Sequence, residues 1–351
     1  MTRRFTRREA MFTAAGAGLG ALGAFGQTRA GNPPYPSWKT GFRQLAPNVY
    51  AYTQAGGPGV PSSAISNGAC ILGPDHWMAI DAFAAPPHTK AFLAAAKSLA
   101  GSRTCDRLIN THHHADHTTG NCFFLPAEIV GHEYCRKAVI SNGISNLAGR
   151  PESWKVGMAE LKLAPPTTTF DDRSRITYWY GNTEVRLMYN GSPAHTWGDA
   201  LIYLPQYKIL WAGDVAFFYV APAAQGGHIS KWIESIDRVN KMDVDVIVPG
   251  HGPIGSKKEL AETREYLTIL KAEAKRRYDM KMSPGKAAAE IEDKLGKYST
   301  WADPAAVRTV NSVVRLYAEF NDSLTSETDM AAVAAASQEY LEIRGGAVQL
   351  R

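Results

Sequence analysis

The sequence predicts an α/β fold with layered sheets, followed by a helical C-terminal segment. Short β-rich runs bounded by Gly and Pro alternate with helical runs through two successive halves of the chain. From Lys257 onward the pattern changes to long helical periodicity. The composition is that of a globular protein, since 45% of the 351 residues are hydrophobic and 20% are charged.

In the first half, strands are expected over residues 44–54 and 64–81, on either side of a Gly- and Pro-rich loop. That loop, residues 55–63, is either an ordinary hairpin loop or a mobile flap over a site. A helix rich in Ala, Lys and Leu is expected over 87–100, and a strand over 105–110 runs directly into a cluster of histidines. These histidines therefore lie at the carboxyl end of a strand, where side chains can converge.

The second half repeats this alternation and then becomes helical. In this region we expect a helix over 135–144 and strands over 127–132, 175–180, 183–189, 201–204, 208–212 and 244–248. A hairpin turn at Gly181-Asn182 is expected to join the strands 175–180 and 183–189. The later helices are expected over 257–280, 284–295 and 303–321, the last capped by Asp303. We thus divide the chain into an α/β domain (31–256) and a helical extension (257–351). The apolar face of the extension either packs on this domain, which we favour, or forms a homodimer contact.

The first 30 residues have the pattern of an export signal. A basic start is followed by a small-residue apolar run and a small-residue end. The Arg7-Arg8 pair resembles a twin-arginine signal, with cleavage after Ala30, and predicts a periplasmic protein. The apolar run from Met11 to Phe25 is short for a membrane span of about 20 residues, so no stable membrane insertion is expected once the signal is removed.

Charge and cysteine content narrow the function classes further. Residues 1–30 hold five arginines and one glutamate, so the formal charge falls from +5 to +1 without them. This near-neutral balance argues against nucleic acid as a partner.

The cysteines are Cys70, Cys105, Cys122 and Cys135, without a C-x-x-C pair. They are either buried free thiols or disulfide-bonded in one of three full pairings, which the sequence does not distinguish.

The histidine cluster has the composition of a metal site. Four of the ten histidines fall within residues 112–117, where His112, His114, Asp116 and His117 form H-x-H-x-D-H. Imidazole and carboxylate suit zinc, and a loop at a strand end can direct alternate side chains to one point. Three further residues follow strand-like runs in Gly-bearing turns, in this order: His195 in GSPAHTWGD, Asp214 in LWAGDVAF and His251 in VIVPGHGPIG.

This ordered set resembles the ligand pattern of the metallo-β-lactamase superfamily, over roughly residues 48–255. The resemblance implies an αββα sandwich with two metal ions in a groove at one edge. By position, it implies that His112, His114 and His195 bind the first ion, that Asp116, His117 and His251 bind the second, and that Asp214 bridges them. Asp81 resembles a supporting aspartate that orients the histidines, and Thr196 and Asp199 match a supporting turn after His195. A satisfied turn aspartate is the alternative for Asp81.

The resemblance also implies a mechanism. Two zinc ions, or iron or manganese in their place, would lower the pKa of a bridging water and polarise an electrophile. Asp116 would then orient the nucleophile and pass a proton to the leaving group. The segment after Asp214 borders the groove in this superfamily and carries aromatic residues that suit a fairly apolar small molecule. These residues, which equally fit a buried core, are Phe217, Phe218, Tyr219, His228 and Trp232.

The leading function is therefore that of a metal-dependent hydrolase that cleaves a lactone, an ester or, like glyoxalase II, a thioester. A β-lactamase or a hydrolytic dehalogenase would use the same site. A β-lactamase is less favoured, because Asp214 at the bridging position resembles the lactonase-like and glyoxalase II-like branches. The alternative from another class is a mononuclear iron persulfide dioxygenase, which the identity of the metal would distinguish, since zinc has no redox role.

Overall fold

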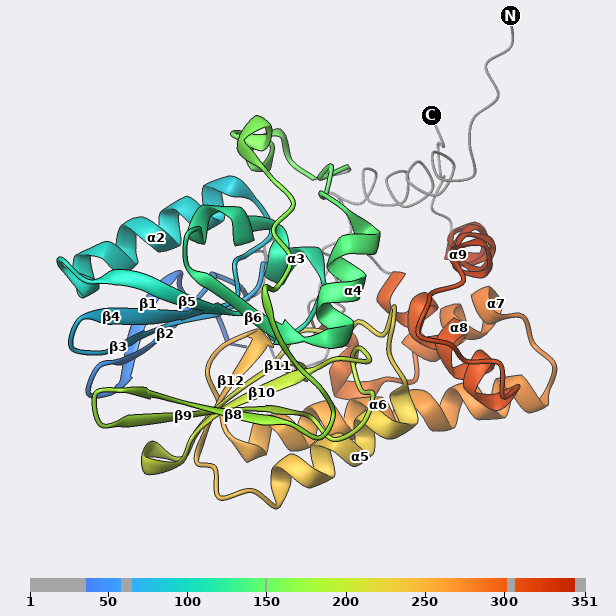
Figure 1. The fold of residues 1–351 in the computed structure, drawn as a ribbon. Helices are drawn as coiled ribbons and strands as arrows, with labels where there is room; N and C mark the ends of the chain where they lie inside the picture. The colour runs from blue at the N-terminus through green and yellow to red at the C-terminus, as the bar shows by residue number, and fades with distance from the viewer. Residues whose placement is uncertain (1–35, 58–64, 149, 302–306, 345–351) are drawn as a thin grey trace, which may run out of the picture.

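Two β-sheets face each other at the centre of the molecule (Figure 1). The computed structural model describes residues 36–57, 65–148, 150–301 and 307–344. The first sheet contains, in spatial order, β1 (Gly41–Ala46), β2 (Val49–Thr53), β3 (Gly68–Leu72), β4 (His76–Ile80), β5 (Thr104–Ile109), β6 (Glu128–His132) and β7 (Thr168–Phe170). The second contains β12 (Val246–His251), β11 (Ile209–Phe217), β10 (Ala200–Leu204), β9 (Thr183–Tyr189) and β8 (Arg175–Tyr180).

Helices cover the outer faces of both sheets, which completes four layers (Figure 1). The helices are α2 (Pro86–Ala100), α3 (Ala115–Thr118), α4 (Glu133–Asn142), α5 (Ile229–Asn240), α6 (Lys257–Asp279), α7 (Pro284–Glu292), α8 (Val307–Phe320) and α9 (Met330–Arg344). Of these, α2 and α4 contact the first sheet and α5 and α6 the second, whereas α7, α8 and α9 pack on one another beside α5 and α6 (Figure 1). Phe92 of α2 packs on the outer face of the first sheet, and Trp232 of α5 packs on the outer face of the second. Met78 and Trp211 belong to the core between the sheets. The αββα sandwich predicted from the sequence is confirmed.

The first two predicted strands, 44–54 and 64–81, were wrong in one respect. Each stretch contains parts of two antiparallel strands joined by a turn. The stretch 44–54 is divided between β1 and β2 by a turn at Pro47-Asn48, where Asn48 has a φ of 62°. The stretch 64–81 is divided between β3 and β4 at Pro74-Asp75. Proline lacks a backbone donor and asparagine tolerates the left-handed region, so both turns have a local physical reason.

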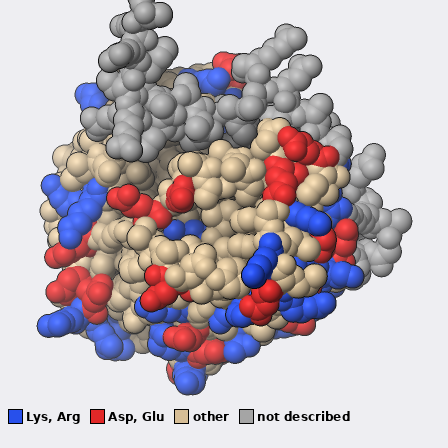
Figure 2. Space-filling model, turned by 90° about the vertical axis from the view of Figure 1, so that its right-hand side faces the viewer, with Lys and Arg blue, Asp and Glu red and all other residues tan. Residues whose placement is uncertain are grey.

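The helical extension packs on the α/β domain within the chain, as favoured from the sequence. Ser256 and Glu259 form a capping box at the start of α6, an arrangement worth about 1 kcal/mol. Leu267, Ile291 and Val313 of three successive helices share one hydrophobic cluster with α5 and β11. The predicted cap Asp303 lies outside the described residues, and a homodimer stays a prediction. On the face in Figure 2, basic and acidic side chains are interspersed.

The topology brings several strand ends to one edge of the sandwich. Strands β4, β5, β6 and β7 run parallel in the first sheet, and β11 and β12 run parallel in the second. Loops after parallel strands meet at the same edge, which is where ligands bind in such sheets. Among the described helices, none is both long and apolar enough to cross a membrane.

Candidate metal centre

The histidine loop begins where β5 ends. Asn110 N–H still donates to Val130 O of β6, at 2.8 Å, and the buried Asn110 side chain exchanges amide hydrogen bonds with Asn121. Thr111 O then accepts from Ala200 N–H at 2.8 Å, which ties the loop to the second sheet. Because the start of this loop is held to both sheets by backbone hydrogen bonds, the following side chains have fixed directions.

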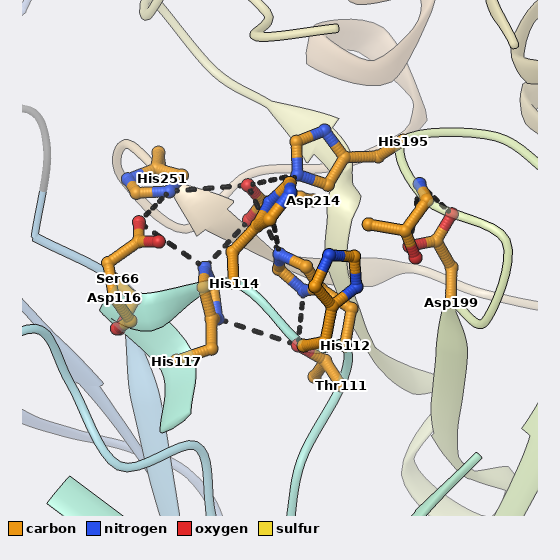
Figure 3. Close-up of polar contacts among 12 residues, drawn as sticks. Ser66, Thr111, His112, His114, Asp116, His117, His195, Asp199, Asp214 and His251 are labelled. Carbon is orange, nitrogen blue, oxygen red and sulfur yellow. Dashed lines mark hydrogen bonds and ion pairs between the residues drawn. The ribbon is translucent and has the colours of Figure 1, made fainter. Parts of the chain in front are cut away.

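Three histidines and one carboxylate form the first group of ligands (Figure 3). His114 Nδ1 lies 2.7 Å from His195 Nε2 and 3.1 Å from His112 Nε2. Asp214 Oδ2 lies 3.1 Å from His195 Nε2 and 3.8 Å from His112 Nε2. One ligand atom from each residue therefore fits within the span that a single ion would coordinate, with the N and O donors that zinc takes.

Asp116, His117 and His251 form the second group. His251 Nε2 lies 3.0 Å from Asp116 Oδ2, and His117 Nε2 lies 3.6 Å from the same oxygen. The Asp214 carboxylate also reaches this group, since its Oδ1 is 3.1 Å from His117 Nε2 and its Oδ2 is 3.4 Å from His251 Nε2. Asp214 thus lies between the two groups, at the bridging position expected from the sequence (Figure 3).

The donor set fits a bound cation. His117 Nδ1 lies 2.8 Å from Asp81 Oδ2 and donates its proton there, which leaves the lone pair on Nε2. That lone pair faces the oxygens of Asp214 and Asp116, and neither Nε2 of His117 nor Oδ1 of Asp214 has a hydrogen bond. Acceptors that face one another in a buried site need a positive charge between them. A metal ion would supply that charge.

The pKa shifts of the histidines also indicate that the carboxylates of this site favour a positive charge between them. Burial disfavours charge on His117, but the carboxylates of Asp214, Asp81 and Asp116 outweigh it and raise the pKa of His117. Burial likewise opposes protonation of His251, whose pKa is nevertheless raised by Asp214 and Asp116. By contrast, burial and neighbouring histidines hold the pKa of His112 and of His114 well below the usual range. Neutral imidazoles are the form that binds metal.

Asp81 supports the cluster from beneath. Its carboxylate accepts hydrogen bonds from Thr111 N–H and from Thr111 Oγ1, both at 2.8 Å, in addition to the His117 contact. Asp81 follows β4 with a φ of 58°, a strained conformation for a residue other than glycine, of the kind found at functional sites. The residue is therefore an orienting group and more than a satisfied turn aspartate.

The turn after His195 is built by Thr196 and Asp199, as predicted. The Asp199 carboxylate accepts from Thr196 N–H at 2.9 Å and from Thr196 Oγ1 at 2.6 Å. Burial raises the pKa of Asp199 to about 6. The closed turn leaves His195 little freedom, so its Nε2 is held beside His114.

Two glycines permit the close approach of β11 and β12 to the site. A Cβ on Gly250 would lie 1.8 Å from Asp214 Oδ1. Gly213 has a φ of 50°, and a Cβ there would lie 2.7 Å from Cβ of Thr111. No larger residue fits at Gly250 while the Asp214 carboxylate stays where it is, or at Gly213 while the Thr111 side chain does.

Three of the five residues predicted for an aromatic groove lie in the core instead. Phe217, Phe218 and Trp232 are fully buried and belong to the core, so they do not line an open surface. Phe217 still matters to the site, because its ring stacks on His251 at 5.1 Å between centroids and 13° between planes. Tyr219 and His228 are partly exposed, and His228 Nδ1 lies 3.3 Å from Glu319 of α8.

Some supporting residues were missed from the sequence. Ser66 Oγ donates to the backbone oxygen of Asp116 at 2.5 Å, and Asn67 Nδ2 donates to Pro249 O at 2.9 Å and Gly252 O at 2.8 Å. Asn67 thereby ties the first sheet to the turn around His251. Nothing local in SNGAC signals this role, because the contact spans 182 residues of sequence.

An open groove of about 780 Å³ lies elsewhere, between α5, α6 and the end of α8. None of the metal-ligand candidates lines it. We therefore assign the chemistry to the ligand cluster rather than to this groove. All four cysteines are free thiols, so of the two expectations for them the unpaired state is correct.

Comparison with known proteins agrees with the fold and the site. The family model for the metallo-beta-lactamase superfamily matches residues 66–251, more than half of the chain. The chain belongs to this superfamily, and its homologues support a hydrolase-type enzyme with a metal-binding His/Asp cluster.

Individual relatives cover most of the α/β domain. The chain is 26% identical over 232 residues to the metallo-beta-lactamase type 2 of Bacillus sp. (strain 170), which covers 64% of this chain and 80% of that protein. It is 27% identical over 235 residues to the metallo-beta-lactamase type 2 of Bacillus cereus, with 64% and 81% covered. A solved metallo-beta-lactamase from Pontibacter korlensis superposes with a TM-score of 0.52 at 19% identity, over 66% of this chain and 99% of that one, and supports the fold.

Proposed function

We propose that the protein is a dinuclear metal-dependent hydrolase that carries two zinc ions and cleaves a lactone, ester or thioester. The observation that carries this proposal is the arrangement of seven ligand candidates in two groups with Asp214 between them. When bound, the ions would acidify a water molecule and polarise the electrophilic carbon of the substrate. One ion would be held by His112, His114 and His195, and the other by Asp116, His117 and His251.

Asp116 is the acid–base group of the proposed reaction. Its side chain is 22% exposed, whereas that of Asp214 is 2% exposed, so Asp116 is the carboxylate that an incoming substrate meets. Burial opposes its ionisation, but His117 and His251 hold the pKa of Asp116 below its usual range. It therefore stays ionised near neutral pH. In that form it would orient the attacking water by accepting its hydrogen bond, take up the proton of that water as the new C–O bond forms, and give this proton to the leaving group as the bond to that group breaks.

β-Lactam hydrolysis is the second candidate. It is favoured by the relatives in Bacillus, which are named metallo-beta-lactamases. Asp214 between the two ligand groups favours the lactonase and glyoxalase II type instead. The two candidates separate by their kcat/KM values on lactones and thioesters against those on β-lactams.

The first experiment is elemental analysis of the protein purified without added metal, followed by an ester, lactone, thioester, β-lactam and haloaromatic panel. Two zinc ions per chain with hydrolysis of the first three classes is the expected result. One iron per chain with oxygen uptake on persulfides would overturn the hydrolase proposal.

Variants then test the site itself. We expect His112→Ala and His114→Ala to abolish turnover and to lower the zinc content, because each removes a ligand of the first group. His76→Ala is the matched control, since His76 is exposed on β4 and absent from both groups. Retained activity in both site variants would refute the assignment.

Export of the protein is a separate proposal, since residues 1–30 lie outside the described part of the chain. We expect the mature protein in the periplasmic fraction, with an N-terminus at Gly31. An Arg7→Lys, Arg8→Lys double variant should keep the precursor in the cytoplasm. Unchanged processing in this variant would exclude the twin-arginine route.

A further inference from the structure

A buried arginine of the helical extension links two loops that contact the first group of metal ligands. Arg315 of α8 is 3% exposed. Its Nε and Nη2 both donate to Gly227 O, at 2.9 and 2.7 Å. Nη2 also donates to Thr325 O at 2.7 Å, and Nη1 donates to Glu327 O at 2.9 Å. The guanidinium therefore holds the segment before α5 with one edge and the loop between α8 and α9 with the other.

The segment before α5 packs on the turn that carries His195. His228 N–H donates to Ala194 O at 2.8 Å. Gly227 lies against the same turn, since a Cβ there would be 2.6 Å from Ala194 O and 3.1 Å from His195 O. In the first turn of α5, the Trp232 ring contacts the His195 ring at 5.3 Å between centroids. A shift of Gly227 would therefore move the backbone of His195.

Glu319 holds the same segment one helical turn after Arg315. Its carboxylate accepts from Ile229 N–H and from Ser230 Oγ, both at 2.5 Å. Residues four apart lie on the same face of a helix. Helix α8 thus presents a donor and an acceptor side by side to the chain at the start of α5.

The loop between α8 and α9 reaches the other ligand loop through Tyr134. Ser326 is the residue between the two carbonyl groups of this loop that Arg315 holds, and Ser326 O accepts from the Tyr134 hydroxyl at 3.1 Å. The Tyr134 ring meets the His113 ring edge-on at 5.4 Å. His113 lies inside the H-x-H-x-D-H motif, between two ligand candidates. The contacts of Arg315 therefore extend to both loops of the first ligand group.

We propose that Arg315 is a positioning residue for the first metal ion. This inference rests on the proposed function, since it concerns the ion that His112, His114 and His195 would bind. His112 and His114 follow a strand of the first sheet, whereas His195 lies between two strands of the second. Ligand atoms from both sheets must meet one ion at about 2 Å, so a residue that fixes both loops raises metal affinity. Helix α8 lies outside the matched family region 66–251, so the extension supplies this support.

The first test is metal affinity, measured by competition with a chromophoric zinc chelator. We expect Arg315→Ala to weaken the binding of one zinc ion about 10- to 100-fold and that of the other less than about 3-fold. Arg315→Lys should recover part of the loss, because an ammonium keeps the charge but lacks the planar fork that reaches both loops.

Arg277→Ala is the matched control. Arg277 is 6% exposed and also belongs to the extension, but its partners Glu273 and Glu290 lie in α6 and α7. Its loss should lower the melting temperature and leave both zinc affinities unchanged. Equal zinc affinities in Arg315→Ala and the wild type, with only a lower melting temperature, would overturn the inference.

Ligand variants show which ion Arg315 affects. His251→Ala leaves the first group intact, and in this background Arg315→Ala should still weaken zinc binding about 10- to 100-fold. His195→Ala leaves the second group intact, and there Arg315→Ala should change zinc binding less than about 3-fold. An equal effect in both backgrounds would mean a general loosening of the domain and would refute a role at the first ion.

Hydrogen exchange of the metal-free protein gives a reading without metal or turnover. Peptides that cover residues 193–199 should exchange faster in Arg315→Ala than in the wild type, and at the wild-type rate in Arg277→Ala. If Arg315→Ala does not fold, Tyr134→Phe replaces it, since this variant removes only the hydroxyl that donates to Ser326 O. We expect it to weaken the first zinc ion about 3- to 10-fold, and an unchanged affinity would then overturn the inference.

The outcomes separate this inference from the proposed function. A wild-type protein that binds two zinc ions but hydrolyses nothing in the panel would count against the proposed function, and the chelator competition would still decide the role of Arg315. Hydrolysis together with unchanged zinc affinity in the Arg315 variants would leave the hydrolase intact and overturn the inference. A wild-type protein that binds no zinc would overturn both.

Discussion

The substitution Asp81→Asn should weaken metal binding without removing any ligand. Asp81 accepts three hydrogen bonds, and the one from His117 fixes the ring with its proton on Nδ1 and its lone pair on Nε2. An asparagine keeps one oxygen for Thr111 N–H but presents an NH₂ group to His117. The imidazole must then carry its proton on Nε2, which faces the ion. Loss of such a partner typically lowers metal affinity about 10- to 100-fold, or about 1.4 to 2.7 kcal/mol.

Competition with a chromophoric chelator measures this effect. We expect the second ion, bound by Asp116, His117 and His251, to be released at about 10- to 100-fold lower chelator concentration. Asp172→Asn is the matched control, because Asp172 contacts His132 Nε2 at 2.9 Å in a similar His–Asp pair that is not among the ligand candidates. Unchanged metal affinity in Asp81→Asn, with only a lower melting temperature, would show that Asp81 supports the fold alone and would refute the reasoning.

Three further predictions concern stability. Chelation of the metal should lower the melting temperature, since ligand saturation 1,000-fold above Kd contributes about 4 kcal/mol, and readdition of zinc should restore it in a thermal shift assay. The pKa of His88 is lowered from 6.5 to about 4 by burial and by Arg150, so the unfolded chain binds a proton that the folded chain does not. Stability should therefore fall as pH drops from about 6.5 to 4, and His88→Gln should flatten this slope in urea titrations; an identical slope would contradict the assignment. Glu319→Ala should cost about 1 to 3 kcal/mol in urea unfolding, because the buried Glu319 carboxylate accepts from Ile229 N–H at 2.5 Å and Ser230 N–H at 3.3 Å, where it caps α5. A loss below 0.5 kcal/mol, on the order of an ordinary surface change, would mean that this cap does not hold the extension in place.

The ligand candidates could be predicted from the sequence because each leaves a local signal. His112, Asp116 and His117 lie in one loop, while Asp214 and His251 lie beside glycines at strand ends. The β-strand alternation likewise predicted the layered fold. A site residue at a strand end can be predicted when its own type, His or Asp, and the glycines next to it in sequence indicate a ligand.

Residues whose role depends on distant contacts could not be predicted. Asn67 reaches the turn around His251 across the sandwich, and Arg308 of the extension contacts the Phe217 ring from a sequence context that is that of an ordinary helix. Phe217 was expected in a groove because it follows Asp214, but the burial of β11 on both faces places it in the core. Tertiary packing decides these cases, and single-sequence patterns do not record it.

The order of the ligands along the chain has a consequence for biosynthesis. The first loop of ligand candidates is translated more than 130 residues before His251, which lies on β12, the last strand of the second sheet along the chain. A nascent chain that stops before this strand holds the H-x-H-x-D-H loop, His195 and Asp214, but lacks His251. The second ligand group is therefore complete only after β12 has been translated, so under the proposed function the full pair of metal ions would be bound after synthesis of the α/β domain.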